Sequence, residues 1–138
     1  MILNVLNFKS NYLGRVINMI NKDIKIHIVG DILSDSGYSS HVRQLSLALN
    51  KIVDVSLEFG TFPGWELKVP QEIIDMASRN YSRETILMIN QPQYWEFGLS
   101  KKPKHFIGFL IFEGNTIPQQ WVDICNDSRI DQIWVPSK

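Results

Sequence analysis

The sequence lacks the features that would place it in a membrane or in an oxidising compartment. Its single cysteine, Cys125, excludes an intramolecular disulfide, and we expect a reducing compartment. No stretch approaches the roughly 18 consecutive apolar residues of a membrane-spanning helix. The N-terminus also has no small-residue cleavage pattern of a secretory signal. These absences predict a cytoplasmic protein.

The sequence also lacks the signatures of common cofactors and of nucleic-acid binding. It contains neither the glycine pattern of dinucleotide-binding folds nor that of a P-loop, and its histidines and cysteine have no metal-ligand spacing. Its 14 Lys and Arg residues balance 14 Asp and Glu residues, which leaves no net charge to attract nucleic acid. We therefore expect no cofactor, no metal and no nucleic-acid partner.

What the sequence does contain is an ordinary apolar fraction, 44%, in a chain long enough to bury one core. From residue 24 onward, apolar strand-like runs alternate with amphipathic helical stretches. Strands are predicted at 24–30, 53–59, 85–89, 105–112 and 132–135, helices at 40–51, 70–79 and 118–126, and loops at 60–69 and 91–103. This order predicts an α/β fold with a Rossmann-like, doubly wound, mostly parallel sheet of about five strands and helices on both faces.

Several prominent residues have predicted structural roles. Ser39 or Ser40 is expected to cap the helix 40–51, His27 to be hydrogen-bonded inside the sheet or at its edge, and His105 to lie at the surface. The helix is expected to bury Val42, Leu45, Ala48 and Leu49. Trp121 and Trp134 are expected in the core. The aromatic residues of the loop 91–103 are expected either to stack on a sugar face or to pack at a domain interface; they are Tyr94, Trp95 and Phe97.

The first 22 residues form a prefix of different composition. They contain Lys9, Arg15 and Lys22 but no acidic residue, and their apolar residues have helical spacing. This pattern favours a helix docked on the domain, and two alternatives stay open. One is a basic amphipathic helix on an anionic membrane surface, and the other is a strand at Leu3–Phe8.

Polar residues that follow the predicted strands are candidate ligand contacts, because ligands of open parallel sheets gather beyond the carboxyl ends of the strands. The loops after the first, third, fourth and fifth strands are rich in carboxylates, amides and hydroxyls, which suits a polyhydroxylated ligand. The candidate substrate-binding residues are Asp31, Ser36, Gly37, Tyr38, Asn90, Gln91, Glu113, Asn115 and Thr116, with Ser34, Asp35, Ser39, Ser40 and Ser137 in the same loops.

One residue of this set is a candidate catalyst. His41, in the first turn of the predicted helix, is a candidate general base or sugar contact, and the positive end of the helix dipole favours its neutral form. Two alternatives concern its neighbours. Gly37 would only supply a positive φ in a turn, and Asp31 with Glu113 would form the carboxylate pair of a hydrolase.

Two segments resemble a known family. The stretch GDILSDSGYSSHVRQLSLALN followed by VDVSLEF resembles the first strand, glycine-bearing loop and first helix of retaining glycosyltransferases with the two-domain GT-B fold, the glycogen-synthase-like group 1 glycosyltransferases. The run FIGFLIFEGNTIPQQWVDICNDSRIDQIWVPSK is similar to their strand ending in Glu, followed by a Trp-bearing helix and a W-x-P-S motif. The matching residues are Glu113, Thr116, Pro118, Trp121, Trp134, Pro136 and Ser137.

The resemblance covers residues 24–138 and corresponds to the N-terminal, acceptor-binding domain of that family. It implies a hexosyltransferase-type enzyme that moves a sugar from a nucleotide-sugar donor to a glycan, lipid or small-molecule acceptor. It also implies that the loop around Gly37 lies near the donor phosphates, that residues 113–116 face the cleft, and that a C-terminal domain holds the donor. We therefore expect residues 23–138 to be an acceptor-side domain that is inactive without its donor-binding domain.

Two alternatives from other classes stay open. One is a non-catalytic α/β domain that binds a partner, or a second copy of itself, through its fifth strand. The other is a receiver-like domain, in which Asp31 and Asp35 with Lys138 would form the acidic pair and the lysine.

Overall fold

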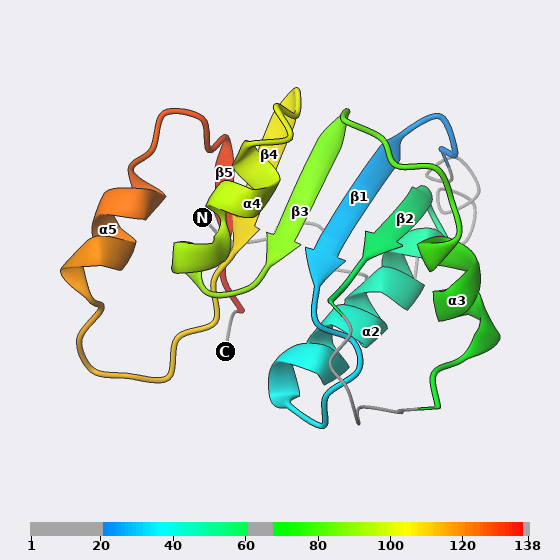
Figure 1. The fold of residues 1–138 in the computed structure, drawn as a ribbon, viewed down its shortest axis with the longest axis horizontal. Helices are drawn as coiled ribbons and strands as arrows, with labels where there is room; N and C mark the ends of the chain where they lie inside the picture. The colour runs from blue at the N-terminus through cyan, green and yellow to red at the C-terminus, as the bar shows by residue number, and fades with distance from the viewer. Residues whose placement is uncertain (1–20, 61–67, 137–138) are drawn as a thin grey trace, which may run out of the picture.

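The computed structural model describes residues 21–60 and 68–136, which adopt an α/β fold with a five-stranded, all-parallel sheet flanked by helices (Figure 1). The predicted Rossmann-like α/β architecture is therefore confirmed. The prefix up to residue 20, most of the loop 60–69, and Ser137 lie outside the described residues.

The strands lie in the order β2-β1-β3-β4-β5. Their bounds are β1 Lys25–Gly30, β2 Asp54–Glu58, β3 Thr85–Ile89, β4 His105–Phe109 and β5 Gln132–Trp134. The chain goes from β1 to its neighbour β2 on one side, and then returns past β1 to β3 on the other side. The order therefore reverses between β1 and β3, and such a switch point is where doubly wound sheets bind their ligands.

One face of the sheet is covered by α2 (Gly37–Asn50) and α3 (Gln71–Ala77), which lie toward the β2 side (Figure 1). The core on this face includes Ile28, Val42 and Val55, each fully buried. The helix α2 approaches β1 closely because Gly30 has no side chain. A Cβ on Gly30 would lie 2.9 Å from Cγ2 of Val42.

The other face is covered by η2 (Pro92–Tyr94), α4 (Glu96–Leu99) and α5 (Gln119–Cys125). The prediction of a loop over 91–103 is therefore wrong, since Trp95 folds the segment onto the sheet. The Trp95 side chain is fully buried, its Nε1 donates to the carbonyl of Asn90 at 2.8 Å, and its ring packs over Gly108 of β4. Trp95 is thus a core residue and is not free to stack on a ligand.

The start of α2 also differs from the prediction. The helix begins at Gly37 and is capped by Ser36, whose hydroxyl accepts from the backbone N–H of Ser39 at 3.1 Å. Neither Ser39 nor Ser40 is the cap. The inward-facing positions also differ from the prediction, since Ser46 is buried and Ala48 is exposed.

The predicted core tryptophans near the C-terminus are only half-buried. Trp121 packs at the margin of the core from α5, a helix that buries none of its residues fully. Trp134 lies in the short strand β5, at the edge of the sheet, and its Nε1 donates to the side chain of Gln132 at 2.9 Å. Both tryptophans therefore pack at the margin of the core and not in its interior.

Among the described residues, no helix is long and apolar enough to cross a membrane.

Candidate functional site

A cleft of about 800 Å³ lies at the carboxyl edge of the sheet, at the switch point. We call it the switch-point cleft. One wall consists of the ends of β1, β2 and β3, with Gly30, Asp31, Glu58 and Asn90. The other wall consists of η2 and α4, which present Tyr94 and Phe97 with 54% and 52% of their surface exposed. Exposed aromatic rings opposite polar strand ends are suited to bind a ring-shaped polar ligand.

Glu58 anchors a buried polar network beneath this cleft. Its Oε2 accepts from Nε2 of His27 at 2.9 Å and from Nζ of Lys101 at 3.1 Å, while Nδ1 of His27 lies 2.8 Å from the hydroxyl of Ser56. Because a carboxylate only accepts, Nε2 of His27 carries a proton, and in the neutral ring Nδ1 accepts from Ser56. The predicted hydrogen-bonded interior position of His27 is therefore confirmed.

Burial and charge act in opposite directions on this network. Burial lowers the pKa of His27 below 6.5, although the hydrogen bond and charge of Glu58 raise it and Lys101 adds to the lowering. Burial raises the pKa of Glu58, but hydrogen bonds from His27 and Lys101 outweigh it and hold that pKa below its ordinary value. Glu58 is thus a carboxylate beside a neutral histidine.

Two aromatic rings close over the same network. Tyr81 meets the ring of His27 edge-on, with the ring centres 4.4 Å apart. The ammonium of Lys101 lies 5.1 Å from the centre of the Tyr81 ring and 4.6 Å from that of Phe97. Phe97 therefore contributes to both the network and the cleft wall, and its ring is stabilised by this cation–π contact.

The loop between β1 and α2 is held by its own side chains. Oδ1 of Asp31 accepts from the N–H of Leu33 at 2.9 Å, and Oδ2 accepts from the hydroxyl of Ser34. The Ser34 oxygen also lies 2.8 Å from the Ser36 oxygen and 2.6 Å from the Ser39 oxygen. The hydroxyls of Ser34, Ser36 and Ser39, predicted as ligand contacts, are therefore engaged within the loop, and that of Ser36 caps α2.

Asp31 is the member of this loop that reaches the cleft. Burial raises the pKa of Asp31, but hydrogen bonds from Ser34 and Ser39 and from the N–H groups of Leu33 and Ser34 bring it below its ordinary value. Among the described residues, no Lys or Arg forms an ion pair with Asp31. Within the described residues, Asp31 is therefore an ionised carboxylate of the cleft without an ion-pair partner.

A second cluster of predicted residues lies away from the cleft. The Tyr38 hydroxyl donates to the carbonyl of Ile111 at 2.6 Å, and burial, together with the nearby charge of Glu113, raises the pKa of Tyr38. His41 lies one turn into α2, since that helix begins at Gly37, and its ring packs on Phe109 with the centres 4.8 Å apart. The expected position of His41 in the first turn is therefore wrong.

Gly37 does not have the positive φ suggested as its structural role. It is the first residue of α2, and a Cβ placed on it would meet nothing within 4 Å.

The loop after β4 leaves Glu113, Asn115 and Thr116 exposed. Gln91 accepts from the side chain of Gln93 at 2.6 Å.

Of the polar candidates that the structure describes, Asp31 and Asn90 line the switch-point cleft, together with Tyr94 and Phe97 from the aromatic segment. The prediction did not include Glu58, Gln93 or Glu96 as contacts. Glu58 would have been selected as a candidate contact if the strand-end rule had been applied to the second strand as well. In β2 it lies two residues after Ser56, so both side chains are on the same face as His27.

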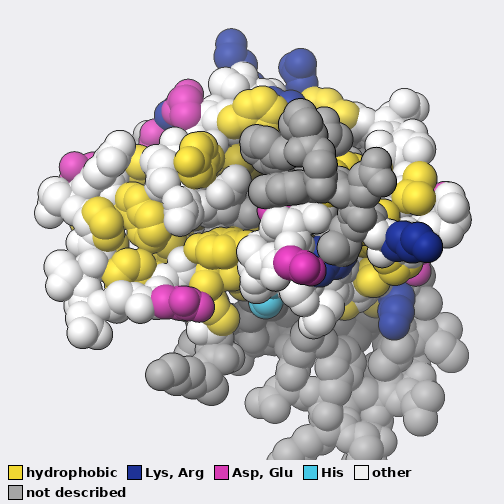
Figure 2. Space-filling model, turned by 60° about the horizontal axis from the view of Figure 1, so that its bottom comes forward, with side chains coloured by type: hydrophobic (Ala, Val, Ile, Leu, Met, Phe, Trp, Pro, Cys, Tyr) yellow, Lys and Arg dark blue, Asp and Glu magenta, His cyan; other side chains and the backbone are white. Residues whose placement is uncertain are grey.

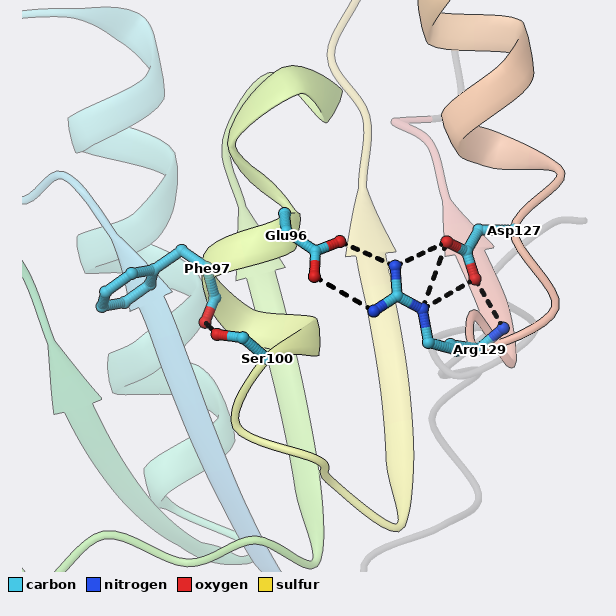
Figure 3. Close-up of polar contacts among 5 residues, drawn as sticks. All are labelled: Glu96, Phe97, Ser100, Asp127 and Arg129. Carbon is cyan, nitrogen blue, oxygen red and sulfur yellow. Dashed lines mark hydrogen bonds and ion pairs between the residues drawn. The ribbon is translucent and has the colours of Figure 1, made fainter.

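Glu96 is at the cleft margin but is bound on its other side. Its two oxygens accept from Nη1 and Nη2 of Arg129 at 3.1 and 2.6 Å, and Arg129 also binds Asp127 (Figure 3). The hydrogen bonds from Arg129 lower the pKa of Glu96 and bring that of Asp127 to about 2. Figure 3 also shows that Phe97 leaves α4 in the opposite direction, toward β1.

The edge of the molecule that holds the ends of the strands is brought forward in Figure 2. Hydrophobic side chains gather on the part toward α5, and most of the Lys and Arg side chains in view lie near the margins. None of the described residues that line the switch-point cleft is Lys or Arg. In the same part of the chain, no three His, Cys, Asp or Glu side chains are arranged to hold a metal ion.

The fold and cleft define the chain as an α/β protein of the doubly wound, Rossmann-like type. Comparison with protein-family models gives no match, and neither curated proteins nor solved structures give one.

Proposed function

We propose that the chain is the acceptor-side domain of a glycosyltransferase and that the sugar acceptor binds in the switch-point cleft. The observation that supports this most directly is the pairing of two exposed aromatic rings, Tyr94 and Phe97, with polar groups at the strand ends. Sugars offer an apolar ring face for stacking and hydroxyls that both donate and accept. The cleft volume of about 800 Å³ is within the usual range for small-molecule sites.

Titration of the ¹⁵N-labelled chain with glucose, N-acetylglucosamine and maltose, followed by amide chemical shifts, tests this proposal. We expect shifts at Gly30, Asp31 and Asn90, and weaker binding in Tyr94→Ala and Phe97→Ala, by roughly fivefold, for loss of one stacking contact. Ile74→Ala, an exposed residue on α3, serves as the matched control and should leave the affinity unchanged. If none of these sugars shifts the cleft amides, the proposal fails.

The strand order supports a second candidate, a receiver-like domain, because receivers also have the order 2-1-3-4-5. Its acidic pair would be Asp31 and Asp35. Incubation with acetyl phosphate and Mg²⁺ followed by intact-mass measurement distinguishes the candidates. A labile mass gain that is lost in Asp31→Asn and Asp35→Asn would favour the receiver.

A further inference from the structure

We propose that the acceptor taken by the switch-point cleft is an amine-bearing sugar, whose ammonium group pairs with Asp31. This inference rests on the proposed function and adds the chemical class of the acceptor. It depends on the balance of hydrogen-bond donors and acceptors and on the charge of the cleft, rather than on its shape.

The charge of the cleft comes from three carboxylates in different states. Glu96 is paired with Arg129 at 2.6 Å, and Glu58 with Lys101 at 3.1 Å. Asp31 forms no ion pair with any Lys or Arg in the described part of the chain. An anionic sugar, such as a sugar phosphate or a uronic acid, would therefore be repelled by Asp31, and the described residues that line the cleft include no Lys or Arg to offset this repulsion.

The polar groups of the cleft are mostly hydrogen-bond acceptors. Both oxygens of Asp31 accept hydrogen bonds from its own loop, and the carboxylate adds its negative charge to the lining of the cleft. Gln93 uses its Nε2 to donate to Gln91, which leaves its carbonyl oxygen to accept. An ammonium group has three donors and no acceptor, so it complements this set better than a hydroxyl does.

The aromatic wall favours the same ligand. Tyr94 and Phe97 expose about half of their surface across the cleft, and ring faces attract cations. Lys101 already uses one such contact, with its ammonium 4.6 Å from the centre of the Phe97 ring. A ligand ammonium between Asp31 and the ring of Tyr94 would be stabilised from both sides, at a distance from the ammonium of Lys101.

The test compares glucosamine, glucose and glucose 6-phosphate by chemical-shift titration at pH 6.5, where an amine is protonated. We expect glucosamine to bind roughly tenfold more tightly than glucose, which corresponds to about 1.4 kcal/mol, and glucose 6-phosphate to bind more weakly than either. The advantage should disappear in Asp31→Asn, which keeps the acceptor for the N–H of Leu33. Glu84→Gln, a remote exposed carboxylate, is the matched control.

A second variant adds charge instead of removing it. Asn90→Asp keeps the oxygen that accepts from the N–H of Gln91, and should increase the preference for glucosamine. Equal binding of glucose and glucosamine, or an unchanged preference in both variants, would overturn the amine assignment and leave the sugar site standing. Absence of binding by all three sugars would overturn both.

Discussion

Gly108 lies beneath the Trp95 ring, and its lack of a side chain allows that ring to pack flat on β4. A Cβ at this position would overlap three atoms of the ring. Because Trp95 is fully buried and its indole N–H is hydrogen-bonded, it has little room to move aside. We expect Gly108→Ala to lower the free energy of unfolding by about 1–3 kcal/mol, the usual cost of overpacking a core.

Urea unfolding followed by tryptophan fluorescence measures this change. Gly37→Ala is the matched control, because a Cβ at Gly37 meets nothing within 4 Å. That substitution should leave the midpoint unchanged or raise it slightly, since alanine restricts the unfolded chain more than glycine does. Equal midpoints for the two variants would contradict the packing described for Trp95.

His27 gives the protein a pH dependence in a defined range. Burial lowers its pKa below 6.5, so the unfolded chain binds a proton at a pH where the folded chain does not. Well above pH 6.5, His27 is neutral in both states and adds no pH dependence to the free energy of unfolding. That free energy decreases as the pH falls through 6.5 toward the folded-state pKa of His27. Glu58 has a lowered pKa, so its contribution is lost only at more acidic pH, as the pH falls below 4.5.

The free energy of unfolding of His27→Gln at pH 7 and pH 5, obtained from urea titrations, tests this assignment. We expect the variant to lose less stability than the parent between these two pH values. His105→Gln, which removes an exposed histidine, should keep the parental difference. If His27→Gln also kept it, another group would have to account for the change.

At the scale of elements, the predicted strands agree closely with the observed ones, whereas the helices differ more. The strand 85–89 is correct to the residue, and the others differ mainly at their ends. Buried parallel strands are continuous apolar runs, which sequence reveals directly. The helices η2 and α4 were missed because they are one turn each and depend on Trp95 packing into the core, a tertiary effect that periodicity does not contain.

The site was harder to predict than the fold, for a related reason. The strand-end rule selected Asp31 and Asn90, which line the cleft, because strand ends follow from the sheet. It also selected serines that the loop uses for itself, since the same hydroxyls that bind ligands also cap helices. Which role Ser36 takes is decided by where α2 begins, and sequence placed that start three residues too late.

The cap of α2 can be tested at this scale. We expect Ser36→Ala to destabilise the protein by about 1 kcal/mol, because it removes the acceptor for the N–H of Ser39 and leaves a helix-end donor unpaired. Ser40→Ala is the control, since the Ser40 hydroxyl accepts from the exposed side chain of Gln44 at 3.3 Å and does not cap the helix. Urea midpoints that are the same for both variants would show that Ser36 is not the cap.

At the scale of the whole molecule, the described part of the cleft has no cationic side chain for the transfer of a sugar from a nucleotide. A departing diphosphate must be stabilised by cations or by aligned N–H donors. The described residues that line the switch-point cleft include carboxylates, amides and aromatic rings, and no Lys or Arg. Under the proposed function, the donor-binding groups therefore come from a second domain.

We accordingly expect residues 1–138 to bind a sugar without transferring one. Incubation of the chain with a panel of nucleotide sugars and an acceptor sugar, analysed by mass spectrometry, should give no elongated product. Uridine diphosphate alone should not shift the amides of Gly30, Asp31 or Asn90, because the carboxylate of Asp31 repels its phosphates. Elongated product, or tight diphosphate binding at these residues, would mean that the chain holds the donor itself and would contradict its assignment as the acceptor side.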